Sequence, residues 1–83
     1  EETLELPNLN LYPNPIQIGA EITLDRTDLA GAQWRISDML GQLLGRGQID
    51  LNKIPTHFIS KPGIYLLELE INNQKWIKKL QVF

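Results

Sequence analysis

Apolar side chains recur at every second position in several short segments of this chain, and Pro, Gly or Asn residues separate one segment from the next. Between Glu21 and Arg26, for example, Ile22 and Leu24 point to one side of an extended backbone while their polar neighbours point to the other. This two-residue period is that of a β-strand with one wet face. About seven such segments, with turn residues every 8 to 12 positions, predict a small antiparallel β-sandwich.

The predicted strands are short and follow one another along the chain. Residues 1–8 are expected to be a linker or a frayed first strand, because Pro7 interrupts pairing there. The two prolines of Tyr12-Pro13-Asn14-Pro15 cannot donate backbone hydrogen bonds and should end the next strand. Residues 51–55 are expected to form a connection. The expected strands comprise residues 9–12, 21–26, 32–37, 42–49, 57–60, 65–71 and 74–83.

Three turns are marked by residues with special backbone conformations. Asp38 can cap a type I turn with its side chain, and Gly41 supplies the positive φ that a following β-bulge requires. Pro62 and Gly63 suit the two central positions of a type II turn. The Asn72-Asn73 pair tolerates the left-handed conformations of a tight hairpin between the last two strands.

A helix over residues 29–44 is the main structural alternative, because apolar residues in this stretch also recur at helical spacing. Gly31, Gly41 and Gly45 would each cost about 1 kcal/mol relative to Ala in a helix, so we predict strands. Gly45 and Gly47 fall inside one of these strands, where they weaken side-chain packing and indicate a bulge or a close backbone approach.

The composition is that of an ordinary globular domain and excludes several classes of function. With 42% hydrophobic and 22% charged residues in 83 positions, the chain should fold alone as one domain. The net charge of -2 and the dispersed Lys and Arg residues argue against a nucleic-acid partner. No apolar run approaches the ~20 residues needed to span a bilayer, so no membrane insertion is expected. Because the first residues are Glu1-Glu2 and no initiator Met is present, we expect a fragment from the end of a longer protein.

Catalytic and metal-binding groups are sparse. His57 is the single histidine, cysteine is absent, and neither Ser37 nor Ser60 has a motif that would place a base beside it. Asp25 and Asp28 are too few for an oxygen-ligand metal site. We therefore expect no enzyme activity, no metal and no cofactor.

Two tryptophans allow a second kind of function. Trp34 and Trp76 could form a sugar-stacking platform if both faced water, as in an accessory β-sandwich that binds polysaccharide or protein through an exposed sheet face. Trp34 is in phase with Ile36, and Trp76 with Leu80, which favours a place in the core for both. Tyr65 is likewise expected in the core, with its hydroxyl reaching a partner at the rim.

The last segment carries Lys78 and Lys79 beside the alternating Leu80 and Val82, and it finishes at Phe83. It could be a plain edge strand whose lysines discourage aggregation. A strand that finishes the chain would also leave an edge and a free carboxylate available for capture by strand addition. On physical grounds both interpretations are open.

Four elements, taken in their order and spacing, resemble a known family. They are Tyr12-Pro13-Asn14-Pro15, the Asp-x-x-Gly turn of Asp38 and Gly41, the Gly-x-Tyr element of Gly63 and Tyr65, and Lys79 followed by Leu80, Gln81 and Val82. From Leu11 to Phe83 the chain is similar to the C-terminal sorting domains of proteins exported by the type IX (Por) secretion system of certain Gram-negative bacteria. It departs from the family at Gln81, where an aliphatic residue is usual, and at Phe83, where a basic residue is common.

The resemblance implies an immunoglobulin-like sandwich, comprising residues 9–83, that addresses a larger cargo protein for export and is not an enzyme. It implies passage through the periplasm to the cell surface or the medium. The implied partners are the type IX translocon, its shuttle proteins and a cell-surface sortase that cuts in the linker before Leu11. A homodimer through edge-strand pairing is left open. The candidate recognition residues are Tyr12, Pro13, Asn14, Pro15, Asp38, Gly41, Gly63, Tyr65, Lys78, Lys79, Leu80, Val82 and Phe83.

Overall fold

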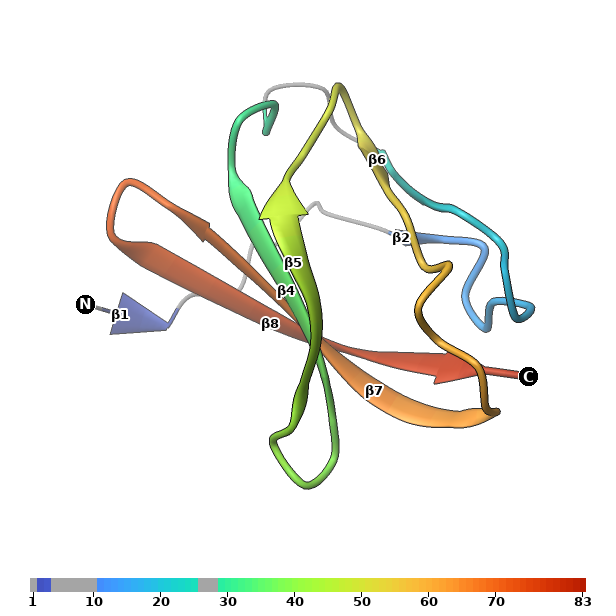
Figure 1. Ribbon diagram of the computed structural model, residues 1–83. Coiled ribbons are helices and arrows are strands. Elements are labelled where there is room, and N and C mark those ends of the chain that lie inside the picture. The colour runs from blue at the N-terminus through green and yellow to red at the C-terminus, as the bar shows by residue number, and fades with distance from the viewer. Residues whose placement is uncertain (1, 4–10, 26–28) are drawn as a thin grey trace.

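Short strands joined by turns make up the molecule (Figure 1). The computed structural model describes residues 2–3, 11–25 and 29–83, and these residues contain eight strands and no helix. The described part of the chain therefore has no helix of the length and apolar character needed to cross a bilayer. The strands are β1 (Glu2–Thr3), β2 (Leu11–Tyr12), β3 (Ile22–Leu24), β4 (Gln33–Asp38), β5 (Leu43–Gln48), β6 (Lys53–Ile54), β7 (Gly63–Ile71) and β8 (Gln74–Val82).

The strands form two sheets. One sheet has five strands in the order β1-β8-β7-β4-β5, and the other has three in the order β2-β3-β6. Neighbouring strands are antiparallel except for β1, which runs parallel to the start of β8. The predicted all-β, immunoglobulin-like sandwich is confirmed, and the parallel β1 is a feature that the sequence did not predict.

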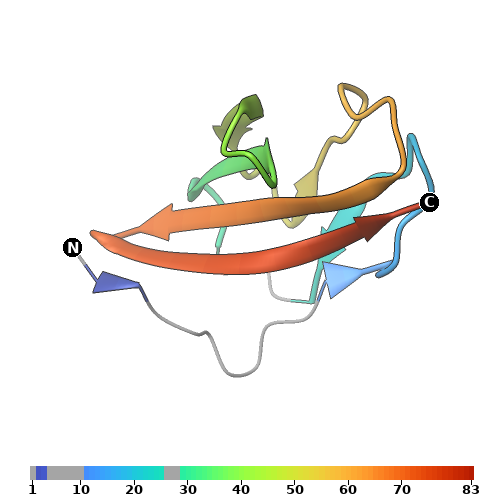
Figure 2. The ribbon, with the colours of Figure 1, turned by 90° about the horizontal axis from the view of Figure 1, so that it is seen from below.

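The longest ladder is the hairpin of β7 and β8, whose register runs from Gly63 opposite Val82 to Ile71 opposite Gln74 (Figure 2). Asn72 and Asn73 connect the two strands with φ values of 53° and 64°. Both values lie in the left-handed region that a two-residue hairpin turn requires. The predicted tight hairpin is confirmed.

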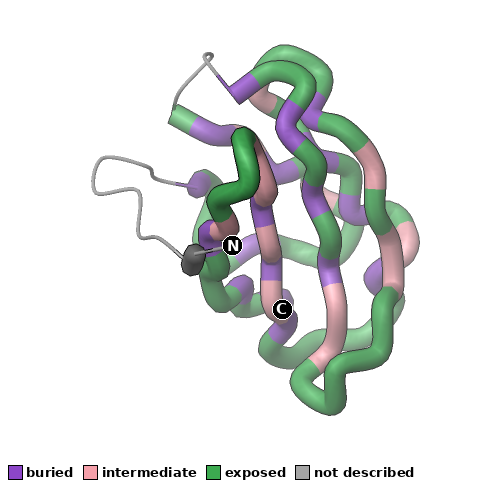
Figure 3. The backbone as a smooth tube through the Cα atoms, turned by 90° about the vertical axis from the view of Figure 1, so that its left-hand side faces the viewer, coloured by how far each residue is buried: buried purple, intermediate pink, exposed green. Residues whose placement is uncertain are grey.

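The core lies between the two sheets. Along β4, β7 and β8, buried residues alternate with more exposed ones (Figure 3). Trp34 and Trp76 are each only 4% exposed, so the predicted core positions are confirmed and an exposed tryptophan platform for sugars is ruled out. The core includes Ile22, Leu24, Trp34, Ile36, Ile54, Leu67, Leu69, Trp76, Leu80 and Val82.

The turn between β4 and β5 is fixed by hydrogen bonds within five residues. One Asp38 carboxylate oxygen accepts the backbone N–H groups of Leu40 and Gln42, each at 2.9 Å. Gly41 has a φ of 88° and donates its N–H to the Asp38 carbonyl, at 3.1 Å. Asp38 also donates its N–H to the Gln42 carbonyl at 3.0 Å, so Gly41 and Gln42 together lie opposite Asp38, as the predicted bulge requires. A separate register shift lies before the turn, between Ile36 and Ser37. The predicted capped turn and bulge are both confirmed.

Gly45 and Gly47 of β5 allow two aromatic rings to approach the backbone. A Cβ on Gly45 would lie 2.6 Å from the nearest ring carbon of Phe58, and a Cβ on Gly47 would lie 3.1 Å from the Trp34 ring. The two rings are stacked, with centroids 5.8 Å apart and planes 9° apart. The predicted close approach is confirmed, although rings and not a second backbone make the approach.

Three predicted features between β5 and β7 are wrong. Residues 57–60 do not form a strand. Residues 53–54, which lie in the predicted connection, form β6 because Ile54 pairs with Ile22 in the second sheet. The chain then turns at Thr56, whose hydroxyl donates to the Ala20 carbonyl. Gly63 is not in a type II turn: its φ is 154°, far from the roughly +80° of that turn, and it already belongs to β7.

The remaining differences are at strand ends. The strand expected at residues 9–12 appears as β2 in its described part, and residues 9 and 10 lie outside the described residues. Of residues 1–8, only 2 and 3 are described, as β1. The strand expected at 21–26 is confirmed at Ile22–Leu24, and residue 26 is outside the described part.

Candidate functional site

The four sequence elements that carry the family resemblance lie at one end of the five-stranded sheet. Asp38 of β4 pairs with Tyr65 of β7, and Tyr65 pairs with Leu80 of β8. One step further along, Gly63 pairs with Val82, and Val82 forms a parallel bridge with Ile16, the residue after Pro15. We call this end of the sheet the motif end. The fold thus brings together residues up to 71 positions apart in the chain, from Tyr12 to Phe83.

A clasp of three backbone hydrogen bonds joins the segment after Pro15 to the end of the chain (Figure 2). Ile16 N–H donates to the Gln81 carbonyl at 2.8 Å, and Phe83 N–H donates to the Ile16 carbonyl at 2.9 Å. Ile18 N–H donates to the Phe83 carbonyl, also at 2.9 Å. We call these bonds the clasp.

The clasp bears on both interpretations of the last segment. In one of the two open interpretations the last residues of β8 present a free edge for strand addition, but the outward backbone groups of Gln81 and Phe83 already bond to Ile16 and Ile18. At its other end, β8 pairs with β1 through Gln74. β8 is therefore not a plain edge strand either, because both of its ends have a neighbour on each side.

The segment Tyr12-Pro13-Asn14-Pro15 forms an exposed bend at the motif end. β2 ends at Tyr12, as the two prolines predict, and the peptide bonds before both prolines are cis. Ile16 then turns inward and is 1% exposed, whereas the Tyr12 side chain is 49% exposed. The bend presents its own side chains to solvent and directs the following residues onto β8.

Several of the candidate recognition residues face the core. Leu80 and Val82 are buried between the sheets, and so is most of Tyr65. The Tyr65 hydroxyl donates to the Lys61 carbonyl at 2.6 Å, which confirms the predicted partner at the rim. These three side chains fix the position of the motif end and are closed to a partner protein.

The other candidates are exposed. Lys79 and Phe83 lie on the face of β8 that points away from the core. Lys78 lies between Trp76 and Leu80 on the side of β8 that faces the core, yet Lys78 is exposed. An inward-pointing charge of this kind is one way in which sheets discourage unwanted pairing.

Sequence reasoning missed two groups at the motif end. Ile16 and Ile18 form the clasp, and only their spacing of two residues after the prolines could have indicated extended backbone there. Met39 and Leu40 at the tip of the β4–β5 turn and Ile64 beside Gly63 are exposed apolar side chains, with Leu40 95% exposed. Pattern analysis places apolar residues inside, so it could not find these three.

The site offers binding groups: exposed aromatic and aliphatic side chains, the ammonium groups of Lys78 and Lys79, and turns held by hydrogen bonds. Within the described residues, no group of three His, Asp or Glu side chains is arranged to hold a metal ion. The His57 ring packs edge-on to Phe58, with ring centroids 5.4 Å apart.

The chain is similar to a described family and to solved structures. Residues 10–82 match the family described as the secretion system C-terminal sorting domain. Among solved structures, the chain is similar to PorZ, described as an essential bacterial surface component of the type-IX secretion system of Porphyromonas gingivalis, with a TM-score of 0.72 and 21% identity. The alignment covers 95% of this chain but 12% of PorZ, and at this identity it supports the fold alone.

A second solved structure, the sulfur carrier protein SoxY from Chlorobium limicola, has a TM-score of 0.49 and 10% identity, with 99% of this chain and 84% of SoxY covered. No curated protein matches the sequence. The family match spans most of the chain, and this family is not known for catalysis. The chain therefore belongs to the family of secretion system C-terminal sorting domains: it is the sorting signal of a type IX secretion cargo, which is exported to the cell surface or the medium of a Gram-negative bacterium.

Proposed function

We propose that the export machinery reads the motif end as a folded surface and not as a linear peptide. The observation that supports this is the convergence of the four elements: Asp38, Tyr65 and Leu80 lie side by side across three strands, and Ile16 bridges Val82. Turn residues and strand residues far apart in sequence would have no reason to occur together if only the last few residues were read.

The candidate residues divide into two roles under this proposal. Exposed side chains contact the machinery: those of the Tyr12–Pro15 bend, Lys78, Lys79 and Phe83. Tyr65, Leu80, Val82, Asp38 and the two glycines, Gly41 and Gly63, hold the backbone in place. The exposed apolar residues Met39, Leu40 and Ile64 add contact area beside them.

We also propose the surrounding steps. The domain is carried through the periplasm as part of a larger cargo, is recognised by the translocon and its shuttle proteins, and itself catalyses nothing. A cell-surface sortase then cuts in the segment before Leu11; we propose residues 1–8, which include β1, as a linker or frayed first strand in front of the sorting domain at 9–83. Edge pairing between two copies would use β5, the terminal strand of the five-stranded sheet.

The test uses residues 1–83 fused to a periplasmic reporter in a type IX host. The decisive variant is Ile18→Pro, which removes the N–H that bonds to Phe83 and leaves the linear sequence of the last strand intact. Its matched control is Ile18→Ala, which keeps the N–H. We expect export to fall strongly for Ile18→Pro and to stay near normal for Ile18→Ala.

A second pair of variants distinguishes the loss of a contact with the machinery from the loss of folding. Phe83→Ala removes a side chain that is 59% exposed, and Leu51→Ala removes one that is 66% exposed in the turn before β6. Both variants should unfold at nearly the temperature of the parent, but only Phe83→Ala should reduce export. Normal export of both Phe83→Ala and Ile18→Pro would contradict the proposal and favour a linear signal elsewhere.

A further inference from the structure

The outer face of the five-stranded sheet, which points away from β2, β3 and β6, carries more positive than negative charge. Among the described residues of the five-stranded sheet, four cationic side chains, Arg35, Arg46, Lys75 and Lys79, share this face with two carboxylates, Glu68 and Glu70. Four minus two gives +2, whereas the whole chain carries a formal charge of -2. The excess on this face therefore arises from the placement of the charges and not from the composition.

Two of these cations lie directly opposite each other. Arg35 of β4 and Arg46 of β5 are register partners. Ile49 N–H bonds to the Ala32 carbonyl, so by alternation Arg35 and Arg46 form a non-hydrogen-bonded pair. Side chains approach most closely in pairs of this type, and like charges directly opposite each other destabilise a sheet. The fold thus keeps an arrangement that costs stability.

The neighbouring residues do not neutralise this pair. Arg35 faces Glu68 on its other side, but the Glu68 carboxylate lies 3.5 Å from the Lys75 ammonium. Arg46 is on β5, the terminal strand of the sheet, and no further strand of the described residues lies beside it to supply a carboxylate. Within the described residues, neither guanidinium forms an ion pair.

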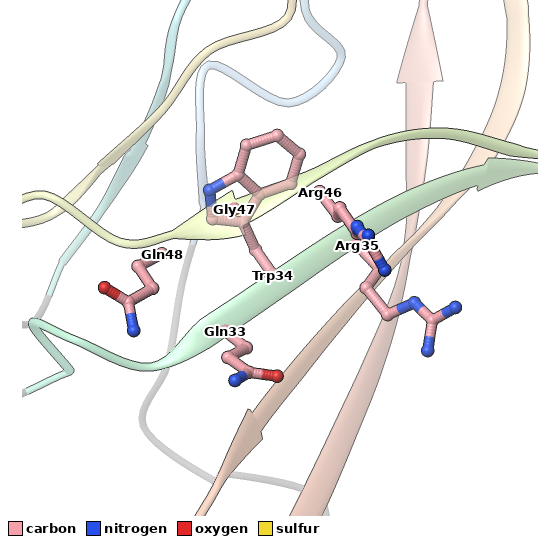
Figure 4. Close-up of a pocket in the computed structure, with 6 residues that line it drawn as sticks. All are labelled: Gln33, Trp34, Arg35, Arg46, Gly47 and Gln48. Carbon is pink, nitrogen blue, oxygen red and sulfur yellow. The ribbon is translucent and has the colours of Figure 1, made fainter.

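Two adjoining hollows accompany the arginines. The first, of about 320 Å³, is lined by Arg35 and Arg46 together with Gln33 and Gln48, which are also opposite each other (Figure 4). Figure 4 shows the four polar side chains leaving β4 and β5 on the side away from the Trp34 ring.

The second hollow, of about 300 Å³, shares Arg35 with the first. Its lining combines the apolar side chains of Leu43, Leu66 and Ile77, from three different strands, with the polar residues Ser37, Glu68 and Lys75. Leu43 and Ile77 are 40% and 44% exposed. The surface thus combines a hollow lined by two arginines with a mixed hollow, in which three aliphatic side chains gather beside the Glu68–Lys75 ion pair.

We propose that this surface docks an acidic segment of a partner protein, with a carboxylate held between Arg35 and Arg46 and a neighbouring aliphatic side chain in the hollow of Leu43, Leu66 and Ile77. Paired guanidinium groups bind carboxylates through charge-assisted hydrogen bonds. The bound carboxylate removes the repulsion between the arginines. The mixed hollow beside them selects a polypeptide segment over a small free anion. Lys79 and Gly41 belong both to this surface and to the motif end, but Arg35 and Arg46 lie outside the motif end, so the proposal does not depend on its role.

The probe is a fluorescein-labelled peptide of alternating Asp and Leu residues, titrated against residues 1–83 by fluorescence anisotropy. One comparison peptide replaces each Asp by Asn, and a second replaces each Leu by Gly. We expect saturable binding of the first peptide and weaker binding of both others. In NMR titrations, methyl shifts of Leu43, Leu66 and Ile77 should change with the same midpoint.

The test variant is Arg46→Gln. Its matched control is Lys53→Gln, which likewise removes one exposed positive charge, from β6 in the other sheet. Losing a charge-assisted hydrogen bond should weaken binding of the Asp-Leu peptide by about tenfold for Arg46→Gln. Binding to Lys53→Gln should be nearly unchanged. Because the like-charge pair is removed, Arg46→Gln should also unfold at the same or a higher temperature than the parent.

Two results would overturn the proposal. One is equal affinity: either the Asp-Leu and Asn-Leu peptides bind the parent equally well, or the Asp-Leu peptide binds Arg46→Gln as well as it binds the parent. The other is marked destabilisation by Arg46→Gln, which would give the arginine a structural role. If Phe83→Ala reduces export but binds the Asp-Leu peptide as the parent does, the result supports separate roles for the motif end and the arginine pair.

Discussion

Replacing Gly45 by Ala tests whether the ring of Phe58 closes the β5 side of the core. Gly45 is not among the residues with positive φ, so Ala can adopt its backbone conformation without strain. The added Cβ would, however, lie 2.6, 2.7 and 2.9 Å from three ring carbons of Phe58. The ring would have to withdraw, and its stacking on Trp34 would be disturbed.

The size of the effect follows from two opposing terms. Restoring ordinary carbon–carbon contact of about 3.6 Å requires a ring displacement on the order of 1 Å, and overpacking of this kind costs roughly 1–3 kcal/mol. Changing Gly to Ala also lowers the entropy of the unfolded chain, which offsets about 0.4–1 kcal/mol of this cost. We therefore expect Gly45→Ala to destabilise the domain by about 1–2 kcal/mol.

The assay is urea unfolding followed by tryptophan fluorescence and circular dichroism, in a double-mutant cycle with Phe58→Ala. Without the ring, the added methyl group meets no clash. In the Phe58→Ala background, Gly45→Ala should therefore be neutral or stabilising by up to about 1 kcal/mol. In thermal unfolding, the single variant should melt about 4–15 °C below the parent.

Equal destabilisation by Gly45→Ala in both backgrounds would refute this reasoning. In that case the ring would not be the group that the methyl meets, and the glycine would be required for another reason. A change in the urea slope without a change in midpoint would indicate an altered unfolded state instead.

Three further predictions concern single residues. Asp38→Ala removes the acceptor of two backbone N–H groups in the β4–β5 turn and should cost about 1 kcal/mol in urea unfolding, whereas Asp38→Asn, which keeps an acceptor oxygen, should cost less. Tyr65→Phe removes the hydrogen bond to the Lys61 carbonyl and should lower the unfolding free energy by roughly 0.5–1.5 kcal/mol; an unchanged value would show that water replaces the hydroxyl. Leu51→Asn should raise the thermal midpoint slightly, because Leu51 is exposed with a φ of 61°, and a lower midpoint would contradict this.

Much of the fold could be read from the sequence where interactions are local. The turn at Asp38 and Gly41 depends on bonds within five residues, and the Asn72-Asn73 hairpin depends on the φ values of those two residues. The inward phase of Trp34 and Trp76 follows from the two-residue period of a strand. These features need no knowledge of distant parts of the chain.

Other features depended on partners that the sequence does not identify. The segment at residues 57–60 has the residue types of a strand, but Ile22 pairs with Ile54 instead, and Phe58 is used to cover Gly45. Gly63 belongs to β7 because Val82 lies opposite it. In each case, pairing with a distant segment overrode a local preference.

The sequence by itself determined the all-β class, the turns and the buried phase of the strands, because these follow from neighbouring residues and from the burial of apolar side chains. Only the tertiary structure decided the motif end, its clasp of Ile16 and Ile18 on Phe83, and the pairing of Arg35 with Arg46. The register between strands decides which side chains face each other, and a shift by one residue would move every side chain to the other face. The position of a surface made from several strands is therefore a property of the assembled sheets.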